Sequence, residues 1–222
     1  RKTKILDIGS TNFYNKIQNK KNFLTENIFF GLHNDFFYSD SYKYKNKLTK
    51  ILLCISDISN EIINTRTLKY LIEICSNNSI ELEILIPENS SKNSPSFLFK
   101  PIINNKKIKI FNFSENIINN YKDTDLVITF ADQTIFYSAV LKIPTIVIFT
   151  KNQNVLYKKI ARKVGLNVCN TNKNLSQLKS KIQSIILNND YRKRSFLNIN
   201  SGAIKKEFNL KIEKLLAFIN TN

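Results

Sequence analysis

The sequence predicts an α/β fold, a doubly wound, Rossmann-like parallel sheet, and two observations support this. Residues 126–130 and 145–149 are unbroken apolar and β-branched runs, as expected of strands buried on both faces. Between them apolar residues recur at helical spacing until Pro144, which ends the helix. Two buried strands joined by one helix make a right-handed βαβ unit. Strands alternate with helical patterns from residue 51 onward, which extends this unit into a parallel α/β domain.

Six strands are expected in chain order. Residues 51–55 form a buried apolar run, residues 80–86 end before Pro87, and residues 107–113 alternate between apolar and polar side chains. Together with the two runs above and a short segment at 166–169, they predict a six-stranded parallel sheet. The strand at 51–55 is expected at its centre.

Helices are expected where apolar residues recur every three to four positions and where capping residues mark an end. They are residues 61–74, a short helix from Ser114 with Glu115 in its first turn, residues 155–164 ended by Gly165, a helix capped by Asn174 and running to residue 187, and a tail over 190–219 broken near Gly202.

The amino-terminal region has a different character. Residues 3–8 and 27–31 have the composition of short strands, and residues 35–50 are aromatic and then basic, which is typical of a linker. We therefore expect residues 1–45 to be the end of a preceding domain with its linker, and residues 46–222 to be one nucleotide-binding domain. The chain contains no Met and begins at Arg1, so we expect it to be a piece of a longer polypeptide.

The composition limits the classes of partner. The formal net charge is +17, but Lys, Asn and Ile are all in excess, as an AT-rich genome produces. The lysine clusters at 43–50 and 106–109 have no Gly-rich or RNP-like aromatic pattern around them, and Tyr42 and Tyr44 fall in the linker. We therefore expect a dispersed, solvated basic surface and no specific nucleic-acid partner. No apolar run approaches the roughly 20 residues of a membrane span, and no secretory signal is present, so a cytoplasmic location is expected.

The cysteines and the single histidine do not indicate a metal site. Cys54, Cys75 and Cys169 are far apart and have no zinc-type spacing, and Cys54 lies inside an apolar strand. His33 stands beside Asn34 in a polar context that is more typical of a structural or surface residue than of a catalyst. We expect no metal and no cofactor.

The turn at residues 131–134 is the expected ligand position. In parallel α/β sheets, ligands bind beyond the carboxyl ends of the strands, against helix N-termini. The segment Ala131-Asp132-Gln133-Thr134 joins a buried strand to the helix that follows it, so it lies at such an edge.

Several short segments of this chain occur in the same order as the motifs of a known family. They are residues 50–60 followed by Thr67 to Leu71, Asp125-Leu126 followed by the turn at 131–134, Tyr137, the Lys142-Ile143-Pro144 segment, Asn152-Gln153, and residues 202–205. In this order they resemble the carboxyl-terminal half of GT-B-type nucleotide-sugar proteins. Within that class the chain is most similar to the UDP-sugar hydrolases of pseudaminic acid biosynthesis, also called spore-coat polysaccharide biosynthesis proteins.

The chain departs from the pattern of that family at its glycines and at two polar residues. Ser56-Asp57 and Ala131-Asp132 replace two glycine pairs, which let a backbone approach phosphate closely. Asp132 suits the N-terminus of a helix but repels a diphosphate at the same place. Tyr137 stands where the family has a Glu, and it cannot accept two hydroxyl hydrogen bonds as a carboxylate does. The catalytic His of the family has no counterpart here, since His33 does not match its motif.

The resemblance implies a reaction and a set of binding roles. Water would release UDP from a UDP-2,4-diacetamido-2,4,6-trideoxy sugar without a metal, in surface polysaccharide or nonulosonic acid biosynthesis. This half would hold the nucleotide and supply no catalytic residue. The Phe113 loop would meet the base, Gln133 and Thr134 would donate to the diphosphate, and Asn152 and Gln153 would face the sugar. Ser56 and Tyr137 complete the expected nucleotide-binding set.

Three other functions remain open from the sequence. A GT-B glycosyltransferase would share this half and differ in its acceptor surface, which belongs to the other half. A non-catalytic member that acts as a binding or interaction module is favoured by the loss of both glycine pairs. A nucleic-acid-binding protein rests on charge alone, and the oligomeric state is not indicated.

Overall fold

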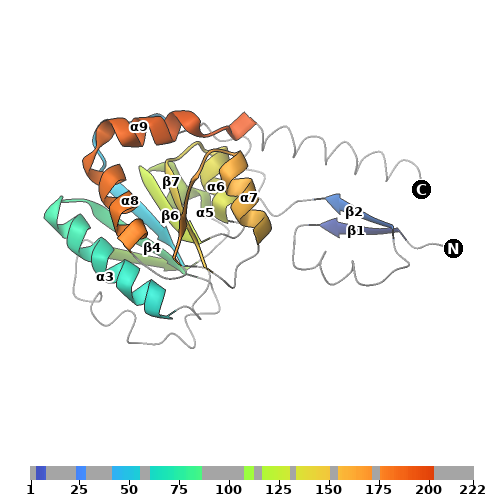
Figure 1. The fold of residues 1–222 in the computed structure, drawn as a ribbon, viewed down its shortest axis with the longest axis horizontal. Helices are drawn as coiled ribbons and strands as arrows, with labels where there is room; N and C mark the ends of the chain where they lie inside the picture. Colours follow the sequence, from blue (N-terminus) through green and yellow to red (C-terminus); the bar gives the residue numbers. More distant parts are fainter. Residues whose placement is uncertain are drawn as a thin grey trace.

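The protein is built on a six-stranded, fully parallel sheet with the strand order β5-β4-β3-β6-β7-β8 (Figure 1). The computed structural model describes residues 4–8, 24–28, 42–55, 61–86, 108–112, 117–130, 134–150, 155–171 and 176–202. The predicted α/β class, the parallel sheet and the central position of the first strand of this sheet are all confirmed.

The strands form where the sequence has buried apolar runs. They are β3 (Lys50–Cys54), β4 (Glu81–Ile86), β5 (Ile108–Asn112), β6 (Leu126–Phe130), β7 (Thr145–Phe149) and β8 (Asn167–Asn170). Every residue of β6 and β7 is buried, as the unbroken apolar runs predict for strands covered on both faces. The six strands agree with the predicted segments to within one residue at each end.

Helices cover both faces of the sheet, which makes the fold doubly wound. One face packs against α5 (Ile117–Lys122), α6 (Thr134–Val140) and α7 (Val155–Lys163), and the other packs against α3 (Glu61–Asn77) and α8 (Ser176–Leu187). Alternate residues of β6 enter the two cores, since Val127 belongs to the first and Ile128 to the second. The predicted N-cap residue Asn174 lies outside the described residues.

The turn after α7 confirms a predicted left-handed cap. Gly165 has a φ of 82°, and its amide donates to the carbonyl of Arg162. A Cβ at this position would stand 1.9 Å from the carbonyl oxygen of Asn198, at the end of α9 (Asn189–Asn198). Glycine is therefore required here both by the backbone angle and by close packing.

Helix α9 crosses the amino-terminal edge of the sheet (Figure 1). Its Ser195 hydroxyl accepts a hydrogen bond from Asn167 at the start of β8, and the Asn200 amide just beyond it donates to the carbonyl of Val164. Asn188 caps the helix, because its side chain accepts from the Tyr191 amide at 2.9 Å. The first piece of the predicted tail is therefore present, and residues 203–222 lie outside the described residues.

The segment before β3 is packed on the domain, which differs from the linker expected over residues 35–50. Tyr42 is 8% exposed and belongs to the same core cluster as α6 and α7. Its amide donates to the carbonyl of Leu141 at 2.7 Å, and its ring meets Phe196 of α9 edge-on. The alternation of tyrosines with lysines concealed this packing, because the lysines beside Tyr42 are exposed.

A second, two-stranded parallel sheet precedes the domain. It consists of β1 (Lys4–Ile8) and β2 (Leu24–Ile28), paired from Lys4 with Leu24 to Ile8 with Ile28. The first strand was predicted over residues 3–8, whereas the second begins three residues before the predicted segment at 27–31. Among the described helices, none is both long and apolar enough to cross a membrane.

Candidate functional site

The order of the strands creates a switch point between β3 and β6. From β3 the chain winds outward through β4 to β5, and it then returns to β6 and winds the other way through β7 to β8. The helices that follow β3 and β6 therefore lie on opposite faces of the sheet. Ligands of open parallel sheets bind at such a point.

Most of the residues that the sequence nominated follow these strand ends but lie outside the described residues. Ser56 follows β3, Phe113 follows β5, Gln133 follows β6, and Asn152 and Gln153 follow β7. The carboxyl ends of parallel strands meet at one edge of a sheet, so the topology brings the starting points of all four loops to the same edge. Ala131, Asp132, Asp57 and His33 also lie outside the described residues, and the binding roles of this set stay predictions.

Thr134, the first residue of α6, turns its side chain toward the sheet. Its hydroxyl forms a short hydrogen bond with the hydroxyl of Thr129 on β6, and both residues are fully buried. The side chain therefore ties the helix start to the strand, and a contact of Thr134 with a diphosphate stays a prediction. Since α6 has only seven residues, its dipole adds little to such a contact.

Tyr137 is placed in the core beneath this turn. Its ring packs on the ring of Tyr121 with the centroids 5.7 Å apart, and the Tyr121 hydroxyl lies 3.3 Å from the sulfur of Cys54 at the end of β3. These contacts join β3, α5 and α6 at the switch point. Tyr137 thus has a clear packing role, and its contact with a nucleotide stays a prediction.

The end of β7 brings a cation to the candidate edge that the sequence analysis did not single out. Lys158 of α7 holds its ammonium 4.4 Å from the ring centroid of Phe149, the last residue of β7. The ring face attracts the cation and fixes it at the carboxyl end of the strand. The sequence feature that could have pointed to Lys158 is its position, one turn into the helix that follows β7.

Thr129 and Thr171 are two further polar residues that the sequence analysis missed. Thr129 interrupts the apolar run of β6, where it read as a strand-forming residue. Thr171, just after β8, donates its amide to the carbonyl of Phe149 at 3.1 Å and so fixes the edge next to Lys158. A hydroxyl in an otherwise apolar strand is the one sequence signal that could have pointed to Thr129.

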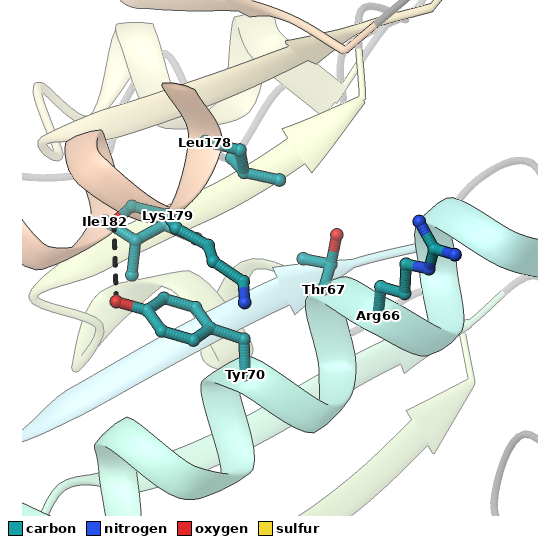
Figure 2. Close-up of a pocket in the computed structure, with 6 residues that line it drawn as sticks. All are labelled: Arg66, Thr67, Tyr70, Leu178, Lys179 and Ile182. Atoms are coloured by element: carbon teal, nitrogen blue, oxygen red, sulfur yellow. Dashed lines mark hydrogen bonds between the residues drawn. The ribbon is translucent and has the colours of Figure 1, made fainter. Parts of the chain in front are cut away.

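A hollow between α3 and α8 is too small for a nucleotide (Figure 2). Its volume is about 10 Å³, which is room for one water molecule. The Thr67 hydroxyl on its wall is buried and has no hydrogen-bond partner within the part of the chain that the structure describes. The surface of the hollow is apolar, so we assign it no role in binding a ligand.

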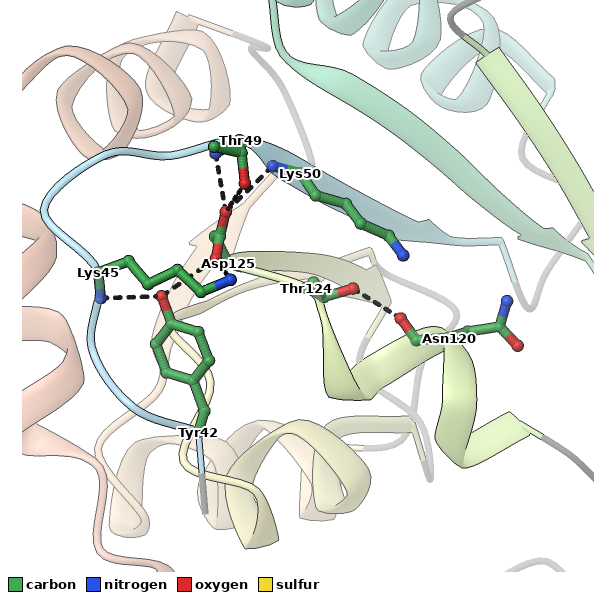
Figure 3. A network of polar contacts seen from close by, with 7 residues as sticks. All are labelled: Tyr42, Lys45, Thr49, Lys50, Asn120, Thr124 and Asp125. Carbon is green, nitrogen blue, oxygen red and sulfur yellow. Dashed lines mark hydrogen bonds and ion pairs between the residues drawn. The ribbon is translucent and has the colours of Figure 1, made fainter. Parts of the chain in front are cut away.

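Asp125, which the resemblance pairs with Leu126, lies at the opposite, amino-terminal edge (Figure 3). One carboxylate oxygen accepts from the Thr49 amide at 2.7 Å, the Thr49 hydroxyl at 2.6 Å and the Lys50 amide at 3.1 Å. The other lies 3.0 Å from the Lys45 ammonium and accepts from the Tyr42 hydroxyl at 3.3 Å. Asp125 therefore fastens residues 42–50 to the start of β6.

The surroundings of Asp125 keep it ionised. Burial alone would raise the pKa of its carboxyl, but the hydrogen bonds from Thr49 and the charge of Lys45 lower that pKa below the usual value. Burial and the negative charge of Asp125 raise the pKa of the Tyr42 phenol, so Tyr42 remains a donor. The contacts are structural, and they show why an Asp before β6 does not mark the ligand site.

Arg192 completes the fastening of this edge. Its guanidinium donates to the carbonyls of Ile185 and Ile186 at the end of α8 and to the carbonyl of Asn46. A buried cation thus satisfies the last carbonyls of one helix and holds the segment before β3.

Among the described residues, no cluster of His, Cys, Asp and Glu has the arrangement of a metal site.

Comparison by sequence gives no assignment. No protein-family model matches the chain, and no curated protein matches it.

Comparison by structure places the fold. A glycosyltransferase from Rickettsia africae ESF-5 superposes with a TM-score of 0.61 at 15% identity, over 95% of this chain and 62% of that one. WaaG, a glycosyltransferase involved in lipopolysaccharide biosynthesis, gives 0.60 at 15% identity, over 89% and 57%. The UDP-GlcNAc 2-epimerase of Methanocaldococcus jannaschii, solved with UDP-GlcNAc and UDP, gives 0.50 at 18% identity, over 69% and 41%.

These likenesses establish the class of fold. The chain has the Rossmann-like α/β architecture of GT-B proteins and spans 62% or less of the length of the three structures.

Proposed function

We propose that this chain binds a UDP-sugar at the carboxyl edge of β3, β6 and β7, as the nucleotide-binding half of a GT-B-type protein. One observation carries the proposal. The switch point of the sheet falls between the strands that precede Ser56 and the 131–134 turn, the two places where the motif order had put the nucleotide. The motif order and the strand order support the same edge.

The roles within the site follow from the position of each group. The Phe113 loop, after β5, meets the base, and Ser56, after β3, contributes a further contact to the nucleotide. The amides of Gln133 and Thr134 receive the diphosphate, and Asn152 and Gln153 face the sugar. Lys158 adds a cation at this edge that partly balances the charge of the diphosphate and the repulsion from Asp132.

The reaction we propose for the longer protein is hydrolysis of the UDP-sugar bond, with a UDP-2,4-diacetamido-2,4,6-trideoxy sugar as substrate. The motif order supports this choice. General-base catalysis needs a group within hydrogen-bond reach of the attacking water, and this half is expected to supply none. The base therefore belongs to the part of the protein that the GT-B architecture adds to this half.

Glycosyl transfer is the second candidate. Two of the three structures described above are glycosyltransferases, and they match with higher TM-scores than the epimerase. In that reaction the same half holds the nucleotide sugar, and an acceptor hydroxyl replaces water. A non-catalytic binding module remains the third candidate, because both glycine pairs are replaced.

Calorimetric titration with UDP tests the binding proposal. We expect weak binding, and we expect Lys158→Ala to weaken it about fivefold, since a partly exposed ion pair contributes about 1 kcal/mol. The matched control is Lys159→Ala, which removes the same charge from the next position of α7, where the side chain is exposed. Equal losses in both variants would mean general charge attraction, and absence of binding in all three proteins would reject the nucleotide site.

A further inference from the structure

The amino-terminal edge of the sheet, opposite the candidate nucleotide site, gathers cations from five separate segments. They are Lys43 and Lys47 before β3, Lys122 at the end of α5, Lys142 between α6 and β7, Arg162 and Lys163 at the end of α7, and Lys193 and Arg194 on α9. Helices of a parallel α/β sheet run against the strands, so their carboxyl ends meet at this edge, and α9 crosses it. Composition alone had led us to expect these charges to be dispersed.

Contacts along α9 show that these segments adjoin one another. The Tyr44 hydroxyl donates to Asn189, which brings the lysines at 43–47 to the start of the helix. The Lys142 ammonium lies 4.8 Å from the ring centroid of Phe196, and the Asn200 amide donates to Val164, beside Lys163. These contacts join the segments that carry Lys43, Lys47, Lys142 and Lys163 to α9 in one basic surface, and Lys122 stands at a helix end of the same edge.

Negative charge is scarce on the part of the chain that supplies most of this surface. Five cations of residues 134–202 belong to this edge, namely Lys142, Arg162, Lys163, Lys193 and Arg194, and the exposed acids near them in sequence are Asp190 on α9 and Asp123 after Lys122. Asp125, a third acid of the edge, is buried and already paired with Lys45. The surface potential of this edge is therefore strongly positive.

Favourable interaction with a helix dipole accounts for the position of some of these cations, but it does not account for the two exposed cations of α9. Lys122, Arg162 and Lys163 stand in the last turns of their helices, where cations are favourable without any partner. Lys193 and Arg194 are in the middle of α9, on the face opposite the buried Arg192 and Ser195. Their exposure has no such structural cause.

Two leucines accompany these cations in solvent. Leu197 is 60% exposed and Leu187 is 57% exposed, and they are the most exposed large hydrophobic side chains in the described part of the chain. Leu197 follows Arg194 and Lys193 by three and four residues, so it shares their face of α9. Leu187 ends α8 just before α9 begins. Exposed apolar side chains set among cations are typical of surfaces that rest on lipid headgroups.

We propose that the surface of Lys193, Arg194, Leu187 and Leu197, with the flanking cations, docks the protein peripherally on a membrane that contains anionic lipids. The cations meet the headgroups and the two leucines enter the boundary with the acyl chains. The carboxyl edge then faces away from the bilayer and stays open to a nucleotide sugar.

A membrane fits this surface better than a nucleic acid does. Three aromatic side chains of the edge are packed on one another, since Tyr42 and Tyr44 lie 6.1 Å and 5.5 Å from Phe196 between ring centroids. Tyr42 is buried and the other two are half-buried, so none of these three presents a fully open ring face on which a base could stack. The exposed leucines would gain nothing from a phosphate backbone, whereas they are buried against lipid.

Vesicle co-sedimentation of the full chain tests the proposal. We expect binding to vesicles that contain about one-third phosphatidylserine and none to pure phosphatidylcholine, with a loss at high salt. The double variant Lys193→Ala/Arg194→Ala should bind about 30-fold more weakly, at a factor of about five for each charge. Leu197→Ser should weaken binding further and make the remainder more sensitive to salt.

The matched control removes the same charge elsewhere. Arg66→Ala/Lys69→Ala alters two exposed cations of α3 and should leave vesicle binding within about twofold, since charges beyond a Debye length contribute little. Equal losses in both double variants, or equal binding to both lipid mixtures, would overturn the proposal. So would tight binding of a single-stranded RNA that Leu197→Ser leaves unchanged, together with no binding to vesicles. All substituted side chains are exposed, and circular dichroism would verify folding.

Discussion

At the scale of single residues, two aspartates at opposite edges of the sheet have opposite effects on their surroundings. Asp125 is 1% exposed and accepts three hydrogen bonds from Thr49 and Lys50, so its negative charge stabilises the fold. Asp132, in the turn that is expected to receive a diphosphate, carries a charge that opposes the ligand. The same residue type therefore supports structure at one edge and is expected to limit binding at the other.

Replacing Asp132 by Gly should strengthen UDP binding about fivefold. The change removes a repulsion of about 1 kcal/mol and lets the backbone approach the phosphates more closely. Stability should fall by only a few tenths of a kcal/mol, because Gly caps a helix nearly as well as Asp. Calorimetry on both proteins measures the change. Asp190→Gly, which removes an acid from the first turn of α9 at the other edge, is the control. An equal gain in both would attribute it to net charge.

Asp125→Asn should lower the free energy of unfolding by about 2 kcal/mol at neutral pH, because it removes a buried charge that is hydrogen-bonded. The pKa of the Asp125 carboxyl is lowered in the folded state. Its stabilisation is therefore present above the unfolded pKa and is lost as the pH falls through the folded pKa. Urea unfolding at a series of acidic pH values should show a flatter pH dependence in the variant. The exposed neighbour Asp123 provides the control Asp123→Asn, for which no flattening is expected.

At the scale of elements, buried strands were predictable and the packing of polar segments was not. A strand buried on both faces has few alternatives to a continuous apolar run, so β3, β6 and β7 could be located to within a residue. β2 could not, because Thr25, Glu26 and Asn27 give it no apolar pattern. The candidate edge also followed from the sequence, since it depends only on the order of strands and helices.

Residues 42–50 show what sequence patterns leave out. Tyr42 and Arg192 are both buried, yet each is surrounded in sequence by Lys and Asn, and the groups that justify their burial lie far along the chain. Lys158 and Thr129 were missed for the same reason, because their partners are set by tertiary contacts. The spacing of apolar residues predicts which face of an element is buried. It does not predict a hydrogen bond to a carbonyl or hydroxyl elsewhere in the chain.

Gly165→Ala should destabilise the protein strongly, because Gly165 lies between α7 and β8 and packs against the end of α9. The left-handed backbone costs about 1–2 kcal/mol for any other residue, and the methyl group would collide with the Asn198 carbonyl for about 1–3 kcal/mol more. We therefore expect a loss of about 2–5 kcal/mol in thermal or urea unfolding. Gly202→Ala is the control, since a Cβ there lies 3.6 Å from its nearest neighbour, an ordinary contact. Similar losses in both would contradict the packing described for α9.

At the scale of the whole molecule, the two edges of the sheet divide the proposed functions. The carboxyl edge is where a nucleotide sugar is expected, and the amino edge is the basic surface that we propose meets anionic lipid. Both follow from one feature of parallel α/β folds, since all strands end at one edge while all helices end at the other. The chain spans only part of the length of the glycosyltransferase structures it resembles, so chemistry on the sugar stays a proposal.

The chain by itself should not hydrolyse UDP-sugars. A half that binds the nucleotide without a general base leaves the attacking water unactivated. The purified chain is incubated with a UDP-amino sugar, and the UDP released is measured by chromatography. The amount should stay at the background level. Release above background that survives repurification would show that this half carries a catalytic group of its own.

The most direct test of the account is amide hydrogen exchange across the chain with and without UDP. Binding at the switch point should slow exchange in the peptides that follow β3, β6 and β7, covering residues 55–60, 131–134 and 150–153. Peptides of the basic amino edge, at 42–49 and 189–194, should be unchanged. Protection confined to that basic edge, or no protection at millimolar UDP, would contradict the assignment of the carboxyl edge as a nucleotide site.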